Sequence, residues 1–257
     1  MNVLALGDVV GEIGCEFLRK KLPAFKRLKG IDFTVVNGEN SATGNGITPF
    51  SAEQLFSCGV DFITTGNHVF RRKEVYELLD ESEFIIRPAN FAKGCPGKGY
   101  SIVDCGRYSV GILNLAGAMY LDKCHCPFET ADRLIEEIRK QTNIILVDFH
   151  AEATSEKKAL GFYLDGKASA FFGTHTYVQT SDASILSKGT GYITDLGMCG
   201  VIDSVLGVDK NIVIQKFKDG MPCRFDGAKG ECMLNGCIFT IDEKSGRCTS
   251  VELVDLR

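Results

Sequence analysis

The sequence lacks several features that would assign it to a class of protein at once. No apolar run reaches the ~18 to 20 residues that a membrane-spanning helix needs. Residues 1–8 show neither a basic stretch nor a small-residue cleavage site, so we expect no secretory signal. Basic residues are not in excess, since 29 lysines and arginines stand against 33 acidic residues and give a net charge of −4. These absences predict a cytoplasmic protein with no membrane partner and no stable nucleic-acid complex.

Cysteine pairs in a metal-binding spacing are also missing. The chain has 11 cysteines, an odd number that cannot pair completely, and no C-x-x-C occurs. Without an export signal we expect reduced thiols that pack as small apolar residues. The nearest approach to a thiolate metal site is Cys124-His125-Cys126, which is a weak zinc candidate because its neighbours supply no second ligand pair.

What the chain does have is the balance of an ordinary globular protein. Its 257 residues are 44% apolar and 24% charged, which excludes wholesale disorder and is sufficient for a sizeable core. No internal repeat, low-complexity tract or linker-like stretch divides the sequence. We therefore predict a single domain over residues 1–257.

The first 90 residues alternate short apolar runs with amphipathic stretches. Ser51 would cap a short helix, with Gln54 at the capping-box position. The alternation predicts an α/β sheet with right-handed crossovers. The predicted strands are 3–6, 32–36, 61–65 and 84–87, and further helices are predicted at 15–29 and 73–79.

The remainder of the chain is richer in β-structure. From residue 193 onward we expect mostly strands. The predicted elements are a hairpin of 100–104 with 108–115, a helix at 128–140, a strand at 144–149, a helix at 155–164, a strand at 168–172, and a hairpin of 233–242 with 248–254.

Polar side chains gather at the carboxyl ends of the predicted strands. Taken singly, each has an ordinary interpretation, such as a helix N-cap for Asp8 or a turn for the Asn-Gly pairs. In α/β sheets, however, such strand ends converge on one crevice where ligands bind. Three of the four histidines in the chain belong to this set. Its members are Asp8, Glu39, Asn40, Asn67, His68, His150 and His175.

These residue types are suited to a pair of metal ions. Two cations ~3.5 to 4 Å apart need a bridging carboxylate, and Glu39 has two oxygens with which to bridge. Amide oxygens are neutral ligands, so they leave positive charge available for a phosphate. Imidazole and carboxylate ligands without thiolate suit manganese, iron or zinc better than calcium or cuprous copper.

Several segments in this order and spacing carry a family resemblance. They are Gly7-Asp8-Val9-Val10-Gly11, Asn37-Gly38-Glu39-Asn40, Gly66-Asn67-His68, Phe149-His150-Ala151-Glu152-Ala153-Thr154-Ser155-Glu156-Lys157, Gly173-Thr174-His175-Thr176 and Gly191-Tyr192-Ile193-Thr194-Asp195. Together they resemble the calcineurin-like metallophosphoesterases and, more narrowly, the bacterial YmdB-type phosphodiesterases. The resemblance implies a four-layer α/β/β/α sandwich that hydrolyses phosphodiesters, with 2′,3′-cyclic nucleotides as the characteristic substrates.

The resemblance also implies a metal centre of two divalent or trivalent ions. Iron and manganese are the first candidates, and zinc and magnesium are the others. His68 would lie near the leaving group. The implied ligands are Asp8, Glu39 and Asn40 for the first ion, and Glu39, Asn67, His150 and His175 for the second.

One position departs from the family pattern. The family has Gly-Thr-His-Thr-His, whose second histidine completes the first metal site, and this chain has Tyr177 at that place. Tyr177 either binds metal as a phenolate or points away and leaves the first ion weakly held. An impaired site would suit a nucleotide-binding or regulatory protein with weak or no turnover, and a hydrolase of phosphomonoesters is a third interpretation. The β-rich C-terminal third also offers edges for a homo-oligomer.

Overall fold

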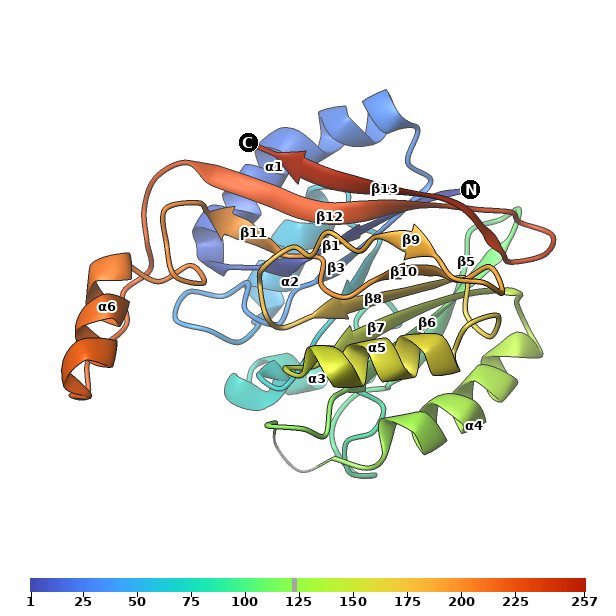
Figure 1. The fold of residues 1–257 in the computed structure, drawn as a ribbon, viewed down its shortest axis with the longest axis horizontal. Coiled ribbons are helices and arrows are strands. Elements are labelled where there is room, and N and C mark those ends of the chain that lie inside the picture. The colour runs from blue at the N-terminus through green and yellow to red at the C-terminus, as the bar shows by residue number, and fades with distance from the viewer. Residues whose placement is uncertain (122–123) are drawn as a thin grey trace.

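The computed structural model describes residues 1–121 and 124–257, and in these residues the strands form two sheets (Figure 1). The first sheet contains β1 (Asn2–Leu6), β2 (Asp8–Val9), β3 (Phe33–Asn37), β4 (Phe62–Thr64), β11 (Met198–Val201), β12 (Cys232–Ile241) and β13 (Cys248–Leu256). Their order is β2-β11-β12-β1-β3-β4, and β13 pairs with β12.

The second sheet lies against the first. It contains β5 (Tyr100–Asp104), β6 (Ser109–Ala116), β7 (Ile144–His150), β8 (Ala170–Thr174), β9 (Ser184–Ile185) and β10 (Gly191–Ile193), in the order β5-β6-β7-β8-β10-β9. Strands β1, β3 and β4 are mutually parallel in the first sheet, and β6, β7 and β8 are parallel in the second. The carboxyl ends of both parallel sets are therefore available to build one site.

Helices cover the outer faces of the two sheets, with α1 and the α4–α5 pair on opposite sides of the molecule, and α6 stands apart from both sheets (Figure 1). None of the helices in the described ranges is both long and apolar enough to cross a membrane. They are α1 (Gly11–Lys29), α2 (Pro49–Ser57), α3 (Val75–Glu81), α4 (Pro127–Arg139), α5 (Thr154–Tyr163) and α6 (Lys210–Asp219), with a 3₁₀ turn at Val69–Arg71.

Alternate residues of the central strands face different parts of the core, as the two-residue period of a strand requires. Val36 joins the cluster made with α1, α2 and α3, whereas Val35 joins the cluster between the sheets. Leu146 enters the same inter-sheet cluster, and Val147 packs with α4 and α5. Because both faces of these strands are buried, they appear in the sequence as continuous apolar runs.

Most predicted elements are confirmed within a few residues, but three expectations were wrong. Residues 84–87 form no strand, and only Ile85 bridges Ile63, because the following Pro88 cannot continue a ladder. The cap of α2 is Thr48 with Ser51 as its capping-box partner, since Pro49 fits the first helical position. The C-terminal third also contains α6, which the apolar periodicity did not predict.

The cysteines are all free thiols, as expected for reduced residues. Six of them are buried among other side chains. The thiol of Cys124 lies 3.5 Å from the backbone carbonyl of Gly117, so it is directed toward backbone and not toward a second thiol.

Candidate metal centre

Three of the predicted ligands, brought from both sheets, form one cluster. Glu39 follows β3, His150 ends β7, and His175 follows β8. One ligand atom from each lies within 4.8 Å of the others. The prediction that strand ends converge on a single site is confirmed for these residues.

His150 lies at the middle of the cluster. Its Nε2 is 3.1 Å from Glu39 Oε1 and 3.0 Å from Asn67 Oδ1. The same nitrogen is 3.1 Å from Nδ1 of His175. Four potential metal ligands thus point toward a shared centre, as the resemblance implied for the second ion.

The other ring nitrogen of His150 is fixed by a chain of hydrogen bonds. Its Nδ1 is 2.9 Å from the Thr174 hydroxyl, which itself donates to Asp148 Oδ1 at 2.7 Å. Asn37 and Thr64 also donate to Asp148. Because the Thr174 proton is committed to Asp148, its oxygen accepts the proton of Nδ1. The nitrogen that faces the cluster is therefore Nε2, the orientation that metal-binding histidines require.

His175 is oriented in the same manner from the opposite side. Its Nε2 lies 3.0 Å from Glu152 Oε2, which leaves Nδ1 facing His150. Its backbone N–H donates to Asp8 Oδ2 at 3.0 Å, and its φ of +96° is unusual for a residue with a side chain. Nε2 of His150 and Nδ1 of His175 therefore face each other beside the carboxylate of Glu39.

Burial and charge make this cluster suited to a cation. Burial raises the pKa of Asp8 well above its ordinary value, and Asp8 Oδ1 has no hydrogen-bond partner among the described residues. Burial also acts to raise the pKa of Glu39, but the adjacent His150 and His68 lower it more. Burial acts to lower the pKa of His150, yet Glu39 and Asp8 raise it to about 9. A bound cation would satisfy both carboxylates and the orphaned oxygen, so the residues fit a metal.

The raised pKa of His150 predicts how the metal-free protein responds to pH. Its folded value of about 9 exceeds the unperturbed ~6.5, so the proton stabilises the fold fully below pH ~6.5, and this contribution is lost as the pH rises toward 9. We expect the melting temperature of chelated protein to fall between pH 7 and 9. The melting temperature of the His150→Gln variant should fall less over this pH range. An equal fall in the wild type and the variant would contradict the assignment of this pH dependence to His150.

The neighbourhood of the proposed first ion is arranged differently. Asn40 Oδ1 accepts from the backbone N–H of Gly46 at 3.1 Å and lies 3.1 Å from His68 Nδ1. The amide nitrogen of Asn40 donates to Glu39 Oε1 and to the Tyr177 hydroxyl. Burial raises the pKa of Tyr177 well above that of a free phenol, so the group is neutral here. Tyr177 therefore reaches the site, but its oxygen contacts Asn40 as a neutral hydroxyl.

His68 lies at the exposed side of the cluster. Its backbone N–H donates to Glu39 Oε2 at 2.9 Å, and its Nδ1 is 3.5 Å from Glu39 Oε1. The imidazole is 25% exposed, whereas His150 is fully buried. His68 is therefore open to solvent and ligand, whereas Glu39 and His150 are buried.

Gly66 permits the close approach of these groups. A Cβ atom at this position would lie 2.2 Å from Cδ2 of His150 and 2.4 Å from Glu39 Oε2. No side chain can occupy that space, so glycine is required before Asn67 on steric grounds and not only to form a turn.

A buried ion pair braces the segment that carries His175 and Tyr177. Lys157 Nζ lies 2.7 Å from Asp195 Oδ2, and both side chains are almost wholly buried. The same oxygen accepts from the Thr176 hydroxyl at 2.7 Å and from its N–H at 3.2 Å. Since φ is positive at His175 and at Tyr177, this anchor holds a backbone that would otherwise relax.

Sequence reasoning gave no role to four residues that orient the site: Asp148, Glu152, Lys157 and Asp195. A signal existed for Asp148, which is two residues before His150 and so shares its face of the strand. Glu152 follows His150 closely, but its direction depends on the turn into α5. The partnership of Lys157 with Asp195 has no local signal.

Comparison with known proteins gives matches along the whole chain. Residues 4–254 match the model of a family described as YmdB-like protein. A Bacillus subtilis protein named 2′,3′-cyclic-nucleotide 2′-phosphodiesterase is 44% identical over 254 residues, covering 99% of this chain and 96% of its own. A solved structure of a hypothetical protein from Thermus thermophilus has a TM-score of 0.93 at 39% identity, covering 100% of this chain and 99% of its own. Another, of a novel phosphatase from Mycoplasma pneumoniae, has a TM-score of 0.93 at 32% identity, covering 100% and 93%.

Proposed function

Because this chain belongs to the YmdB-like protein family, we propose that it is a metal-dependent phosphodiesterase acting on 2′,3′-cyclic nucleotides or related phosphodiesters. The observation that carries the proposal is the orientation of His150 and His175 toward Glu39. Thr174 and Glu152 hold the far nitrogen of each ring, so the near nitrogens face the place where a cation would lie. A cluster built only for stability would not need this arrangement.

We further infer that residues 1–257 form one domain of four layers, an α/β/β/α sandwich. Three apolar clusters support this inference. One lies between α1–α3 and the first sheet, one between the two sheets, and one between the second sheet and α4–α5. In this arrangement the site occupies the edge where the parallel strands of both sheets end.

The proposed centre holds two ions, with iron or manganese as the first candidates. Bound there, they would lower the pKa of water and offset the negative charge of the phosphate. The residues that would hold them are Asp8, Glu39 and Asn40 for the first ion and Glu39, Asn67, His150 and His175 for the second.

The chain's own residues have separate tasks in this proposal. Asp148, through Thr174, holds a proton on Nδ1 of His150, so Nε2 is the nitrogen that would release its proton and bind the ion. Glu152 accepts the proton of His175 Nε2 in a hydrogen bond, which leaves Nδ1 of His175 to bind the ion. His68 would give a proton to the departing ribose oxygen, which is too basic to leave readily as an alkoxide.

Metal removal and substrate choice test the function together. We expect the purified protein to contain metal and to hydrolyse a 2′,3′-cyclic nucleotide, faster than a linear diester or a phosphomonoester. A chelator should abolish turnover, and Mn²⁺ or Fe²⁺ should restore it better than Ca²⁺. Full activity in excess chelator would contradict the two-metal proposal, and preference for a monoester would contradict the substrate.

The role of His68 can be separated from that of a ligand. We expect His68→Ala to keep its metal and lose ~10² to 10⁴ in rate, the usual scale of general acid catalysis. The loss should be smaller for a nitrophenyl diester, because nitrophenolate leaves without a proton. A lowered metal content in this variant would show that His68 is instead a ligand.

One observation favours a second candidate, a nucleotide-binding protein with weak turnover. Asn40 Oδ1 is engaged by Gly46 and His68, and the Asn40 amide nitrogen is engaged by Tyr177. The first ion would have to compete with these contacts. Nucleotide binding without metal-stimulated hydrolysis in the experiment above would select this candidate.

A further inference from the structure

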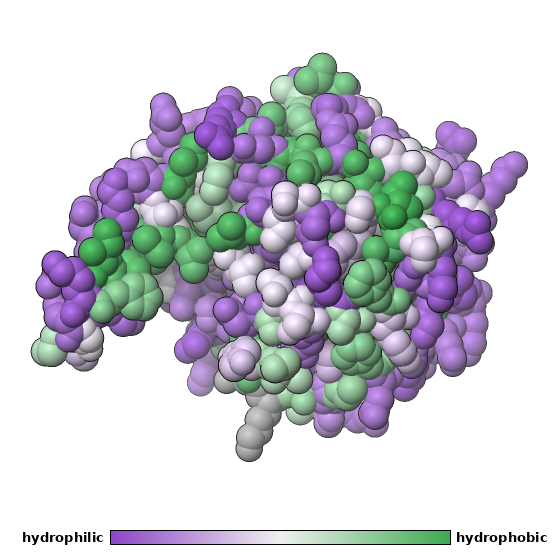
Figure 2. All heavy atoms as spheres, viewed as in Figure 1, coloured by the Kyte–Doolittle hydropathy of each residue, from purple (hydrophilic) through white to green (hydrophobic). Residues whose placement is uncertain are grey.

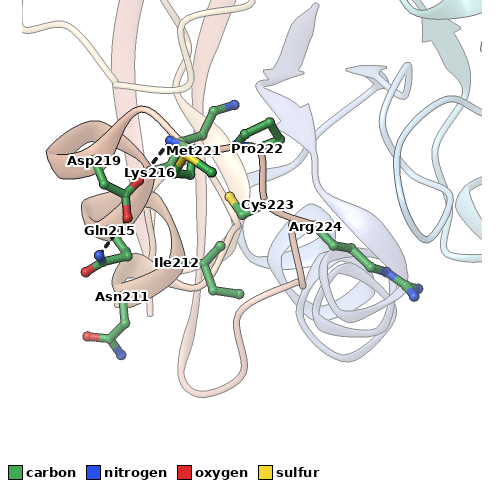
Figure 3. Close-up of a pocket in the computed structure, with 9 residues that line it drawn as sticks. All are labelled: Asn211, Ile212, Gln215, Lys216, Asp219, Met221, Pro222, Cys223 and Arg224. Carbon is green, nitrogen blue, oxygen red and sulfur yellow. Dashed lines mark hydrogen bonds between the residues drawn. The ribbon is translucent and has the colours of Figure 1, made fainter.

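Surface hollows lie outside the metal centre as well. One, of about 490 Å³, lies between α6 and the segment that follows it, where Ile212 and Met221 line it (Figure 3). Figure 2 shows apolar side chains gathered over this part of the molecule. Another, of about 590 Å³, lies beside α1 and is lined by Ile13 and Phe17. Neither is lined by a residue of the metal centre, so both are separate from the groups that would hold the ions.

The loop of residues 41–46, between β3 and α2, holds a proposed ligand of the first ion. The N–H of Gly46 donates to Oδ1 of Asn40 at 3.1 Å, and the backbone carbonyl of Asn40 accepts from the N–H of Gly11 at 2.8 Å. An amide oxygen has two lone pairs, so the bond from Gly46 engages one of them and leaves the second available to an ion. The position of Gly46 therefore decides where the Asn40 oxygen lies.

This loop has an unusual backbone and little support from the core. Three successive residues, Gly44, Asn45 and Gly46, have φ between +79° and +84°. Asparagine tolerates this left-handed region better than most residues, but it is still uncommon there. The N–H of Ala42 donates to the Gly46 carbonyl at 3.0 Å, and the N–H of Asn45 donates to the Ala42 carbonyl at 3.3 Å. Residues 43–45 are exposed, so packing does not hold them in place.

Arg72 supplies support to this loop from another part of the chain. Its Nε donates to the carbonyl of Asn45 at 3.1 Å, and a terminal nitrogen donates to the carbonyl of Thr43 at 2.8 Å. A guanidinium group offers its donors in a rigid planar fork, so it holds these two carbonyls at a set spacing. The aliphatic part of Arg72 also lies against Gly46, where a Cβ atom would be 2.9 Å from Arg72 Cγ. Arg72 thus contacts both the exposed part of the loop and the glycine that donates to Asn40.

Arg72 also belongs to the segment that carries His68. The 3₁₀ turn Val69–Arg71 separates the two residues, and the N–H of Arg71 donates to the His68 carbonyl at 2.9 Å. Nδ1 of His68 lies 3.1 Å from Oδ1 of Asn40. The segment after β4 and the loop after β3 are therefore joined twice, by His68 at the site and by Arg72 outside it.

We propose that Arg72 is a positioning residue for the first ion, because it holds the loop of residues 41–46 and thereby the Asn40 oxygen that would bind that ion. The inference rests on the proposed function, since it concerns a ligand of the proposed centre. Binding of the substrate phosphate is the alternative role for an arginine near this site. The contacts favour positioning, because two nitrogens of Arg72 already donate to backbone carbonyls. Arg71, in contrast, is exposed, and its side chain makes no hydrogen bond or ion pair among the described residues.

Metal titration of the chelated protein tests the proposal. The wild type should bind two Mn²⁺ ions. Arg72→Gln should weaken one of them by about tenfold or more, the usual effect of losing a group that supports a metal ligand, and should leave the other unchanged. The direction is diagnostic, because removing a positive charge near a cation would by itself tighten binding.

Arg71→Gln is the matched control for the titration, since it removes the same charge one position away. It should weaken neither ion. The proposal is overturned if Arg72→Gln binds both ions as the wild type does, if Arg71→Gln weakens binding equally, or if the wild type binds a single ion.

Hydrogen exchange provides a measurement that needs no metal. The amides of Ala42, Asn45 and Gly46 report on the loop, because each donates a hydrogen bond that holds its shape. In chelated Arg72→Gln these amides should exchange about tenfold faster or more than in the wild type, because the loop opens more often. The same amides in Arg71→Gln should exchange as in the wild type. Equal exchange in Arg72→Gln and the wild type would overturn the proposal.

Turnover distinguishes positioning from substrate binding. At limiting Mn²⁺ we expect Arg72→Gln to be slower than the wild type, and excess Mn²⁺ should restore most of the rate with an unchanged KM for a 2′,3′-cyclic nucleotide. A raised KM in saturating metal, with both ion affinities unchanged, would assign Arg72 to the phosphate and overturn the proposal. A wild type that binds two ions without hydrolysing the nucleotide would contradict the proposed function alone, since titration and exchange still decide the role of Arg72.

Discussion

Glu39→Gln is expected to remove metal binding and phosphodiesterase activity together. Glu39 contacts His150 Nε2 at 3.1 Å through one oxygen and the His68 backbone through the other. The amide keeps the size of the side chain but loses the charge that both proposed ions would share. If the ions contribute ~4 kcal/mol to the transition state, the rate falls by ~10³. Metal content by elemental analysis and turnover of a cyclic nucleotide measure the two effects.

Two further variants make this prediction specific. Glu53→Gln on the exposed face of α2 makes the same chemical change outside the site and should leave metal and rate unchanged. Tyr177→His, which supplies the imidazole of the family pattern, should act in the opposite direction and raise occupancy of the first ion. Normal metal content and rate in Glu39→Gln would contradict the bridging role.

Lys157→Met is expected to lower the free energy of unfolding by ~3 to 5 kcal/mol, the usual effect of leaving one partner of a buried ion pair uncompensated. Asp195 would keep its charge without Lys157 Nζ, which lies at 2.7 Å in the wild type. Its bonds to Thr176 position the residues on either side, His175 and Tyr177. We therefore expect weaker metal binding as well, measured by titration beside a denaturant unfolding curve.

The adjacent residue provides a matched control. Lys158 also pairs with a carboxylate, that of Asp182 at 3.1 Å, but both groups are partly exposed. Exposed pairs contribute little, so Lys158→Met should cost less than ~1 kcal/mol. The double variant with Lys157→Met and Asp195→Asn should lose less free energy of unfolding than the sum of the losses in the two single variants, because it has no unpaired buried carboxylate. If Lys157→Met and Lys158→Met lower the free energy of unfolding equally, burial does not make the Lys157–Asp195 pair more important than the exposed pair.

Much of the candidate site was accessible from the sequence, because strand ends carry a local signal. An apolar run followed by a polar residue, in most cases with a glycine nearby, marks such an end, and parallel strands place these ends on one edge. Glu39, His150 and His175 were found in this way, and the structure groups them within 4.8 Å. Helix α1 was predicted from apolar periodicity for a similar reason, because that pattern is also local.

The sequence by itself therefore determined the α/β class, most of the strands and the residues that meet at their ends, since these depend on patterns within short windows. Only the tertiary structure decided which groups orient them. Thr174 and Asp148 set the ring of His150 from neighbouring strands, and Lys157 reaches Asp195 across 38 positions. It also decided that α6 stands exposed and that the Tyr177 hydroxyl meets Asn40. Such contacts depend on how the two sheets and their loops pack together. They join residues that are far apart in the sequence, so no pattern within a short window of sequence predicts them.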